Sequence, residues 1–563
     1  MKKNYVWALL ASMFMVGCSQ NDDLPENPGE DQKVEKELSY IAINVNAAPN
    51  VGGRVATDGN FAEGSPVENK VETACFFFFD KVGNAFNVAG YVPTSNSTTP
   101  DNDASDSNGE ATNWVKYTLT DSGDDVDEGV NNNVERMLDP VLVIETKKSV
   151  YPASVVAVLN WEPSDKTQGI SLETLRESVL ADYKNDGKFI MSNSVYLNAT
   201  TPVYCTPLSE QNFADEETAA EAHPVDIYVE RVAVKANVTA NYGTGASSFP
   251  VKLENDTPLS ITIDGVDTQV YARITNWIFN VNNTKSYLMK NLDGLTETTG
   301  FSWNDPTHFR SYWASAYAFA GSTAWNSTTR VYNNTFLWDN FKDAGTADYC
   351  LENTDATNFT QVVVKGQLVN STGDPLNIAQ WYGKYYTAAQ LLEAVANVVR
   401  DRIYVQSSGS TTEIASSHLQ LVWAYDKDVA MTKEKERDLY TVKFALKNGV
   451  TACKSDGTNF NTGEVDAIFA SLSPAKYWNN GTVYYYLPIE HYLTDANGNN
   501  KAVIRNHFYD IQVNGVVGLG TPVPAPENDD PIPPVKPEDW ETYIAAKINV
   551  LAWKTVSNNV TLK

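Results

Sequence analysis

The chain has 563 residues, of which 42% are hydrophobic and 20% charged, a composition typical of a globular protein with two or three domains. Its 42 basic residues are outnumbered by 70 acidic ones, so the net charge is −28 and a broad basic surface for nucleic acid is excluded. The 29 tyrosines, with plentiful threonine and valine, favour strands over helices.

The first 18 residues have the pattern of a signal peptide. The basic "MKK" precedes the apolar run "YVWALLASMFMV", which is too short to span a bilayer as a stable helix. Met15-Val16-Gly17-Cys18 is similar to a bacterial lipobox, with Met15 in place of the commoner leucine. We therefore expect Cys18 to carry a lipid such as palmitate; the alternative is an ordinary signal peptide with a chance cysteine. The acidic stretch that follows resembles the surface-export signal of Bacteroidota lipoproteins.

Two short stretches near opposite ends of the chain have nearly the same sequence. "YIAINV" covers residues 40–45, and "YIAAKINV" covers residues 543–550. Alternate residues of a strand face the same side. Each stretch therefore has one apolar face, made of Ile41, Ile43 and Val45 in the first and of Ile544, Ala546, Ile548 and Val550 in the second. Aligning Ile43-Asn44-Val45 with Ile548-Asn549-Val550 predicts that both strands fit one groove.

An isolated arginine follows the first stretch. Arg54 lies in "NVGGRVATDG", where Gly52 and Gly53 suit an accessible loop that a protease can cut. We expect cutting at Arg54 to remove the first stretch, which is then a placeholder strand. The second stretch would fill the same groove in a neighbouring molecule.

Strand-like runs, many of them β-branched or aromatic, recur along the chain and are separated by Gly, Asn, Asp and Pro clusters. They cover residues 71–80, 141–148, 154–161, 226–240, 272–281, 360–369, 418–426, 438–446, 483–489 and 507–516. Convincing helical patterns are few, the clearest being at 171–183 and 387–403. The chain is therefore predicted to be mainly β, with β-sandwiches and a few decorating helices.

Turn-rich and proline-rich segments divide the chain. The stretch at 241–250 predicts a domain boundary, and the proline cluster at 521–540 predicts an extended spacer before the last strand. The acidic loops at 93–113 and 121–133 are predicted to be solvated surface loops. The first resembles a calcium loop in its alternating polar residues, but it lacks the turn glycine and the final glutamate of one.

No catalytic or metal-binding motif stands out. The five histidines are scattered, and those beside strands, such as His491 and His507, are expected to be structural. The tryptophan-rich stretch at 300–338 is expected to pack in a core or interface, with a sugar-binding patch as the alternative. Four further cysteines lack any C-x-x-C pair, so a zinc site is not predicted and disulfides remain open: Cys75, Cys205, Cys350 and Cys453. We predict no enzyme, no cofactor and no metal.

A sandwich that loses a strand exposes unpaired backbone groups and an apolar cleft, which a strand from another chain can fill. Burying four to six apolar side chains at roughly 1.5–3 kcal/mol each stabilises such a contact by on the order of 10 kcal/mol before ordering costs. Ordering the free tail offsets much of this gain. A head-to-tail contact of this kind does not close on itself, so it builds a filament.

Several stretches together resemble one known family. They are "VERVAVKANV" (229–238), "YCLENT" (349–354), "VVVKGQLV" (362–369), "VIRNHFYDIQVNGVVGLGTPV" (503–523), the proline spacer and "INVLAWK" (548–554). The chain is similar to the fimbrillins of Bacteroidales type V pili, in particular to the major-subunit family of the short (minor) fimbriae. The resemblance runs over most of the chain and is strongest from about residue 226 onward.

The resemblance implies two transthyretin-like β-sandwich domains and transit to the surface as a lipoprotein. It implies that an arginine-specific, trypsin-like protease then removes the N-terminal segment. The family's cleaved arginine matches Arg54, with Val55 as the new N-terminus. Further implied partners are identical subunits joined head to tail, the anchor and tip accessory fimbrial proteins, and the outer membrane, which the precursor contacts transiently through its lipid.

The expected organisation is a signal peptide with lipobox (1–18), a propeptide with the placeholder strand (19–54), an N-terminal β-sandwich (55–243), a C-terminal β-sandwich (244–520), a proline-rich spacer (521–540) and a donor strand (541–563). The donor strand is expected to act through Ile544, Ala546, Ile548, Val550, Leu551 and Trp553. The predicted function is a shaft subunit of a cell-surface fimbria that supports adhesion and biofilm formation. The alternatives are a tip or accessory adhesin of the same pilus and an anchored surface lipoprotein that binds glycans.

Overall fold

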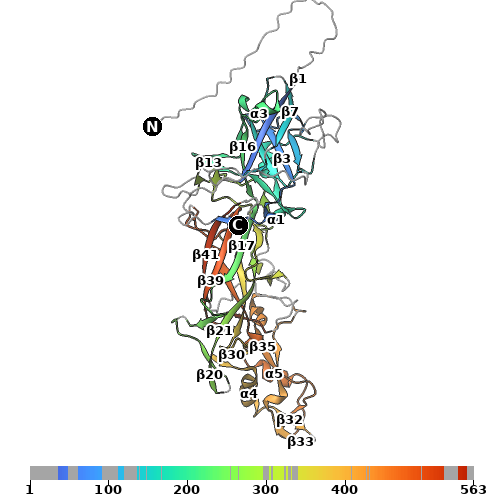
Figure 1. The fold of residues 1–563 in the computed structure, drawn as a ribbon. Coiled ribbons are helices and arrows are strands. Elements are labelled where there is room, and N and C mark those ends of the chain that lie inside the picture. The colour runs from blue at the N-terminus through green and yellow to red at the C-terminus, as the bar shows by residue number, and fades with distance from the viewer. Residues whose placement is uncertain are drawn as a thin grey trace, which may run out of the picture.

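The structure is a computed structural model of the chain. It describes residues 36–47, 61–91, 112–119, 136–138, 140–147, 149–165, 168–253, 255–263, 265–295, 304–305, 309–321, 325–326, 331–332, 340–407, 409–426, 428–429, 432–495, 497–524 and 543–554. The molecule is elongated, with an N-terminal sandwich at one end, a second sandwich in the middle and a smaller helix-containing region at the other end (Figure 1). The protein is mainly β, as the sequence predicts.

The N-terminal sandwich is organised around β1 (Lys36–Ala47). Its strand order is β4-β7-β1-β16-β12-β8-β3-β5, with β6 beside β1 and β15 beside β8. The bounds of these strands are β3 (Thr73–Phe79), β4 (Ala89–Tyr91), β5 (Trp114–Thr118), β6 (Arg136–Leu138), β7 (Val141–Lys147), β8 (Ser154–Leu159), β12 (Met191–Asn193), β15 (Thr206–Pro207) and β16 (Val225–Arg231).

The second sandwich has the strand order β2-β41-β39-β18-β21-β29-β38-β40, with β17 between β39 and β28 and with β27 beside β21. Its core lies between the β39 ladder and the β29 ladder and includes Ile511, Val513, Val362 and Trp277. The strand bounds are β2 (Phe61–Glu63), β17 (Ala233–Ala240), β18 (Phe249–Lys252), β21 (Tyr271–Asn280), β27 (Lys342–Asp343), β28 (Asp348–Leu351), β29 (Gln361–Val369), β38 (Thr482–Pro488), β39 (His507–Val517), β40 (Thr521–Pro522) and β41 (Tyr543–Lys554).

A third region is inserted between β29 and β38. One of its sheets has the order β31-β30-β37-β35-β34 and a smaller one has the order β33-β32-β36. Its own apolar core includes Leu391, Val395 and Phe444. The bounds are β30 (Ile378–Trp381), β31 (Lys384–Tyr386), α4 (Ala388–Val399), β32 (Tyr404–Ser407), β33 (Ser410–Glu413), β34 (Leu419–Trp423), β35 (Thr441–Leu446), β36 (Ala452–Cys453), α5 (Glu464–Ala470) and β37 (Ala475–Trp478). The expected single sandwich over 244–520 therefore carries an additional folded insertion.

The remaining elements are short. They are α1 (Pro66–Asn69), α2 (Leu172–Glu177), α3 (Glu217–Ala220), the small pairs β9 (Val179–Leu180) with β22 (Ser286–Tyr287), β10 (Lys184–Asn185) with β11 (Lys188–Phe189), β13 (Tyr196–Asn198) with β14 (Thr201–Val203), β19 (Ser260–Ile263) with β20 (Val266–Gln269), β23 (Asn304–Asp305) with β24 (Arg310–Ser311) and β25 (Trp325–Asn326) with β26 (Val331–Tyr332), and the 3-10 turns Glu210–Asn212, Ser416–His418, Lys433–Leu439 and Asn479–Gly481. None of the described helices is long and apolar enough to cross a membrane.

The two helices expected from the sequence both form, but both are shorter than predicted. The helix expected over 171–183 is α2, which ends at Glu177 because Val179 and Leu180 extend into a strand and pair with β22. The helix expected over 387–403 is α4. Thr387 caps it by accepting a hydrogen bond from the Gln390 N–H at 3.2 Å, which satisfies a donor that the first turn leaves unpaired.

The chain passes from the first sandwich to the second earlier than expected. β16 belongs to the first sheet, whereas β17 pairs with β39 of the second, so the change occurs at Val232 rather than after residue 243. The turn-rich stretch at 241–250 connects two strands of the second sandwich instead. The proline-rich spacer also starts later than residue 521, because Thr521 and Pro522 form β40 and pair with β38.

The two sandwiches are packed against each other through an apolar junction. β8 is buried along its whole length, and β3 is buried everywhere except at its first residue. Cys75, Phe77 and Val156 on one face of these strands pack with Leu288 and Trp313, which follow β16 in the chain. The run "CFFFF" is thus explained by a strand that is covered on both faces.

Buried charges at this junction are paired. Glu230 of β16 accepts from Lys290 Nζ at 2.6 Å and from Arg310 Nε at 2.8 Å, and all three side chains are at most 1% exposed. Burial lowers the pKa of Lys290 despite the neighbouring Glu230 carboxylate. Removing one of these three side chains would leave an uncompensated buried charge, which is costly. The cluster therefore stabilises the contact between β16 and the segments that carry Lys290 and Arg310.

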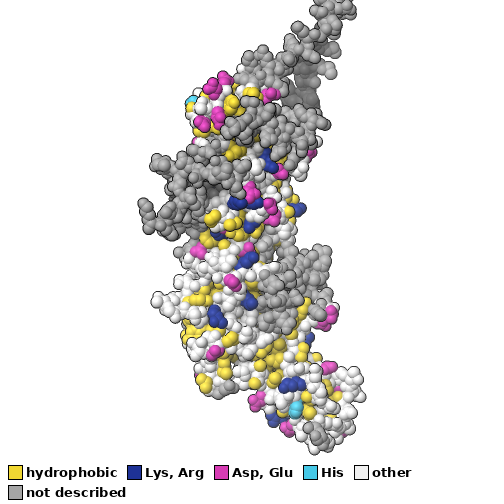
Figure 2. Space-filling model, turned by 45° about the vertical axis from the view of Figure 1, so that its right-hand side comes forward, with side chains coloured by type: hydrophobic (Ala, Val, Ile, Leu, Met, Phe, Trp, Pro, Cys, Tyr) yellow, Lys and Arg dark blue, Asp and Glu magenta, His cyan; other side chains and the backbone are white. Residues whose placement is uncertain are grey.

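On the outer surface drawn in Figure 2, lysine and arginine side chains are scattered rather than gathered into one basic patch.

The histidines beside strands are structural, as expected. The Tyr312 carbonyl lies 3.1 Å from His491 Nε2, and the Tyr509 hydroxyl lies 2.9 Å from His491 Nδ1. Burial and the nearby cations Lys290 and Arg310 lower the pKa of His491 to about 3. The neutral imidazole is therefore part of the native packing.

We expect the protein to lose stability as the pH falls from 7.5 to 5.5. The unfolded chain protonates His491 with a pKa near 6.5, whereas the folded chain does not, so the unfolded state binds more protons as the pH falls through 6.5. The free energy of unfolding should drop by about 1.4 kcal/mol at pH 5.5 for this one histidine. His491→Gln should remove that part of the pH dependence, as measured by urea unfolding at both pH values. A variant with the unchanged pH dependence of the parent protein would contradict this explanation.

Candidate functional site: the two end strands

The candidate site consists of the first and last described strands, β1 and β41. β1 changes partners half-way along its length. From Lys36 to Ala42 it is antiparallel to β7, and from Ile43 to Ala47 it is parallel to β16. The second half of β1 also pairs with β6 on the β7 edge, and its first half also contacts Ala214 on the β16 edge. β1 therefore joins the two halves of the N-terminal sandwich and has partners on both edges.

The inward face of β1 is fully buried. Ser39, Ile41, Ile43 and Val45 are each at most 1% exposed. The three apolar side chains pack with residues of β3, β7, β8 and β16 in the core of the first sandwich. Burying them contributes roughly 1.5–3 kcal/mol each. Without β1, the edges of β7 and β16 and this apolar cleft would face solvent. We call this space between β7 and β16 the β1 slot.

β41 lies in the other sandwich, where it is antiparallel to β39. Its predicted apolar positions Ile544, Ala546, Ile548 and Val550 are opposite the buried β39 residues Val516, Val513, Ile511 and Tyr509. Residues directly opposite each other in an antiparallel pair share a face. These four positions therefore lie on the core side of the strand, and Leu551 and Trp553 fall on the alternate positions.

Within one chain the two end strands do not share a groove. β1 occupies the first sandwich, and β41 covers the edge of β39 in the second (Figure 1). Three residues at the end of β41, Ala552 to Lys554, also pair with β2. The single chain thus has its β1 slot filled by its own β1 and its last strand held on its own second sandwich.

The predicted processing residues Cys18, Arg54 and Val55 lie outside the described residues, as does most of the proline-rich spacer. The described strands on either side of Arg54 are nevertheless informative. Ala47 ends β1 in the first sheet, and Phe61 begins β2 in the second sheet. A cut at Arg54 would therefore separate β1 from every later element of the chain.

The segment that follows β2 is tied firmly to the second sandwich. Ser65 and Glu68 form a capping box at α1, and the Glu68 side chain is 3% exposed. Its carboxylate accepts hydrogen bonds from Lys235 Nζ of β17 at 2.8 Å and from the Tyr349 hydroxyl of β28. Burial raises the pKa of Glu68, but these hydrogen bonds outweigh burial and hold the pKa below its usual value. The Glu68 carbonyl also accepts from Arg231 Nε at 3.2 Å.

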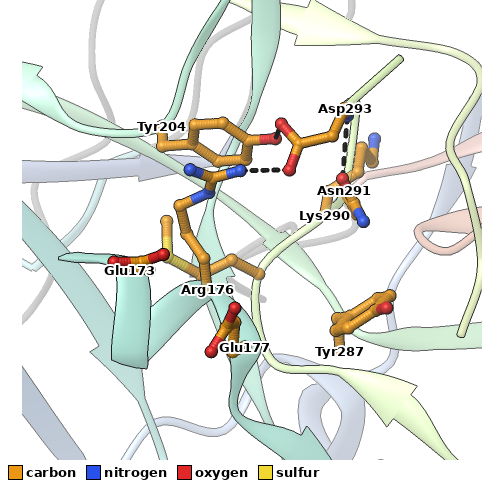
Figure 3. Close-up of a pocket in the computed structure, with 9 residues that line it drawn as sticks. Glu173, Arg176, Glu177, Tyr204, Tyr287, Lys290, Asn291 and Asp293 are labelled. Carbon is orange, nitrogen blue, oxygen red and sulfur yellow. Dashed lines mark hydrogen bonds and ion pairs between the residues drawn. The ribbon is translucent and has the colours of Figure 1, made fainter. Parts of the chain in front are cut away.

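A polar cavity of about 230 Å³ lies between α2 and the segment 287–293 (Figure 3). Arg176 points at Asp293 and pairs with it, and the Tyr204 hydroxyl donates to Asp293 Oδ1 at 2.7 Å. Burial and the Asp293 carboxylate raise the pKa of Tyr204 to about 12. Arg176, Asp293 and Tyr204 thus pair with one another along one wall of the cavity.

Other candidate groups are also structural. Cys75, Cys205, Cys350 and Cys453 are free, which answers the question of disulfides left open by the sequence. No cluster of possible metal ligands occurs among the described residues. Trp313 is buried in the junction core, and Trp325 lies in β25. Trp303 and Trp338 lie outside the described residues.

Comparison with known proteins identifies the C-terminal part of the chain. Residues 476–559 match the family model described as major fimbrial subunit protein type IV, fimbrillin, C-terminal. This region is similar to the C-terminal part of a fimbrillin. The match includes β38, β39, β40 and β41, so the last strand and the strand that holds it belong to the matched region. Over residues 476–559 the match supports the resemblance to fimbrillins drawn from the sequence.

No curated protein matches the chain. Solved structures that align with it include a fimbrilin from Porphyromonas gingivalis W83, with 12% identity, a TM-score of 0.31 and coverage of 92% of this chain and 98% of the other. The tip fimbrial protein Mfa3 from Porphyromonas gingivalis, with C-terminal truncation, aligns with 11% identity, a TM-score of 0.28 and coverage of 92% and 100%. A fimbrial assembly protein from Parabacteroides distasonis aligns with 11% identity, a TM-score of 0.26 and coverage of 60% and 87%.

Sequence reasoning missed β2 and the Glu68 anchor. The S-x-x-E pattern of Ser65 to Glu68 is a recognised signature of a helix start and could have located α1. No local pattern indicates that Glu68 contacts Lys235, because the two residues are far apart in the sequence. The pairing of β2 with β41 is likewise set by the tertiary fold.

Glu68→Gln should lower the free energy of unfolding by about 2–3 kcal/mol, because it leaves the largely buried Lys235 ammonium without its carboxylate. Urea unfolding of the two proteins measures this. Glu72→Gln is the matched control, since Glu72 lies on the same segment but forms its ion pairs with Lys70 and Lys188 at 39% side-chain exposure. Its effect should be much smaller. Equal effects of the two substitutions would show that the segment is not anchored through Glu68.

Proposed function

We propose that this fimbrillin is a shaft subunit, exported as a lipoprotein on Cys18, activated by cutting after Arg54 and polymerised by strand exchange. In the polymer, the last strand of one subunit would fill the β1 slot of the next. The observation that carries the proposal is the position of β1: it joins both halves of the first sandwich, and all of it precedes Arg54.

The two strands are compatible in pattern. β1 buries every residue from Ile41 to Asn46, and its apolar side chains Ile41, Ile43 and Val45 share one face. The last strand has small or branched apolar residues at alternate positions from Ile544 to Val550, the same face that its register presents toward the core of the second sandwich. A strand with this period can enter the β1 slot without burying a charge on the core side.

Transfer of the last strand from its own chain to the β1 slot of a neighbour is expected to be favourable. On its own chain, β41 pairs along its length with β39, whereas its other edge pairs only with the three residues of β2 within the described part of the chain. In the β1 slot a strand meets β7, β16 and β6, so more of its backbone groups find partners. The gain offsets the loss of the β39 ladder and the ordering of the tail.

Cutting at Arg54 leaves the rest of the subunit intact. β2 and α1 follow the cut and remain tied to the second sandwich through Glu68. The segment 1–54 holds five basic and seven acidic residues, so the net charge changes only from −28 to −26. The cut subunit would therefore remain folded and acidic, with an open slot at one end and a transferable strand on the other sandwich.

We further propose that the fimbria supports adhesion and biofilm formation. An arginine-specific protease would make the cut, and anchor and tip accessory proteins would be partners of the subunit in the fimbria. A tip adhesin caps a filament and an anchored lectin does not polymerise, so neither alternative needs a last strand of this kind. The matched family region, which contains β41, favours the shaft role.

Arg54→Ala should abolish polymerisation, because the placeholder strand would stay in the β1 slot. Surface extracts should contain uncut, lipidated precursor that migrates as a monomer on gels. Arg402→Ala, at an exposed arginine in the inserted region, is the matched control and should assemble like the parent protein.

A second experiment distinguishes the cleavage step from the role of the last strand as donor. A chain that keeps Arg54 but lacks residues 543–563 should be cut to a new N-terminus at Val55 and still fail to polymerise. Normal fibres from Arg54→Ala would refute the cleavage step, and gel ladders from the truncated chain would refute the donor role.

A further inference from the structure

The similarity between β1 and the last strand allows two registers that differ by two residues. In the first, Ile43-Asn44-Val45 coincides with Ile548-Asn549-Val550. In the second, Tyr40-Ile41-Ala42 coincides with Tyr543-Ile544-Ala545. A shift of two residues keeps every side chain on its face of the strand. The apolar pattern therefore cannot select between them, and the residues of the other face must do so.

Ala42 is the position at which the two registers differ most. It is 6% exposed and is paired with Val141 of β7. The first register would put Lys547 at this buried position opposite Val141, where an ammonium group is strongly disfavoured; Asn44 is buried to a similar degree, at 7% exposed, but lies opposite the carboxylate of Asp226. The second register puts Ala545 there, which repeats the residue that β1 itself has at this place.

Asp226 of β16 adds a second distinction. Asn44 is directly opposite it and donates to Asp226 Oδ1 at 3.0 Å, and Asn46 donates to the same oxygen at 3.2 Å. The carboxylate of Asp226 is exposed at the outer side of the slot. In the second register Lys547 takes the position of Asn44, and Asn549 takes that of Asn46, so a cation and an amide meet this carboxylate.

We propose that the incoming strand takes the second register and that Asp226 selects it by pairing with Lys547 of the donating subunit. The inference rests on the proposed strand exchange and adds the residue that determines its register. Lys547 is the only charged residue between Thr542 and Trp553. On its own chain its position in the ladder is opposite Gln512 of β39.

The second register changes the core only modestly. Ile544 repeats Ile41, while Ala546 is smaller than Ile43 and Ile548 is larger than Val45. The lost and added volumes are on neighbouring positions of one face, where side chains can repack. Tyr543 repeats the half-buried Tyr40 at the start of the slot.

Cysteine pairs can distinguish the registers in assembled fibres. Asp226→Cys with Lys547→Cys should link neighbouring subunits under oxidation, because the second register puts these residues directly opposite each other. Tyr228→Cys with Leu551→Cys is the matched pair that only the first register would link, since Tyr228 is opposite Asn46. Both pairs are made with Cys205→Ser, because Cys205 lines the same cavity as Asp226. Non-reducing gels should show at least about tenfold more ladder for the first pair than for the second.

A charge swap provides an independent readout. Lys547→Glu should reduce assembly by like-charge repulsion, and adding Asp226→Lys should restore it. Ladders from the Tyr228 pair alone, fibres that neither pair links, or a charge swap that fails to restore assembly would each overturn the register. Failure of the cut parent protein itself to polymerise would instead overturn the proposed function.

Discussion

The N-terminal sandwich depends on one strand with two sets of partners. β1 is antiparallel to β7 through Ala42 and parallel to β16 from Ile43, so a single segment holds both halves of the N-terminal sandwich together. Its inward side chains are almost completely buried. A strand with this role would ordinarily be indispensable to the domain. Here it is also the only described strand that precedes Arg54, so the strand on which the sandwich depends is the one that cutting removes.

The contacts between the two sandwiches do not depend on β1, so the loss of this strand should affect only the first sandwich. The other face of the first sheet is covered by residues from beyond β16, including Leu288 and Trp313, and the buried charges Glu230, Lys290 and Arg310 fix that contact. Segment 61–69 is held to β17 and β28 through Glu68. None of these contacts involves β1. The junction can therefore stay intact while the slot is empty, which is what a subunit that exchanges one strand requires.

Patterns local to the sequence predicted much of the fold, and contacts between distant residues explain what they missed. Runs rich in β-branched and aromatic residues located β3, β7, β8, β21, β29 and β39 closely, because strands that are buried on one or both faces need such residues. The domain boundary was placed about ten residues late, since a turn inside the second sandwich has the same composition as a linker. The insertion between β29 and β38 was predicted as one helix and two strands, at 418–426 and 438–446, but not as a separate region. At the site, the apolar faces of both end strands were recognised, whereas the Asp226 contact with Asn44 and Asn46 depends on a residue about 180 positions away and has no local signature.

The most direct test of the central claim is a cryo-electron microscopy structure of the fibre assembled from the cut chain. It should show residues 543–554 of one subunit between β7 and β16 of its neighbour, in the place that β1 holds in the single chain, with the first residue of each subunit at Val55. Fibres in which each subunit keeps its own β1 in the slot, or in which the slot is empty and subunits meet through other surfaces, would contradict the account.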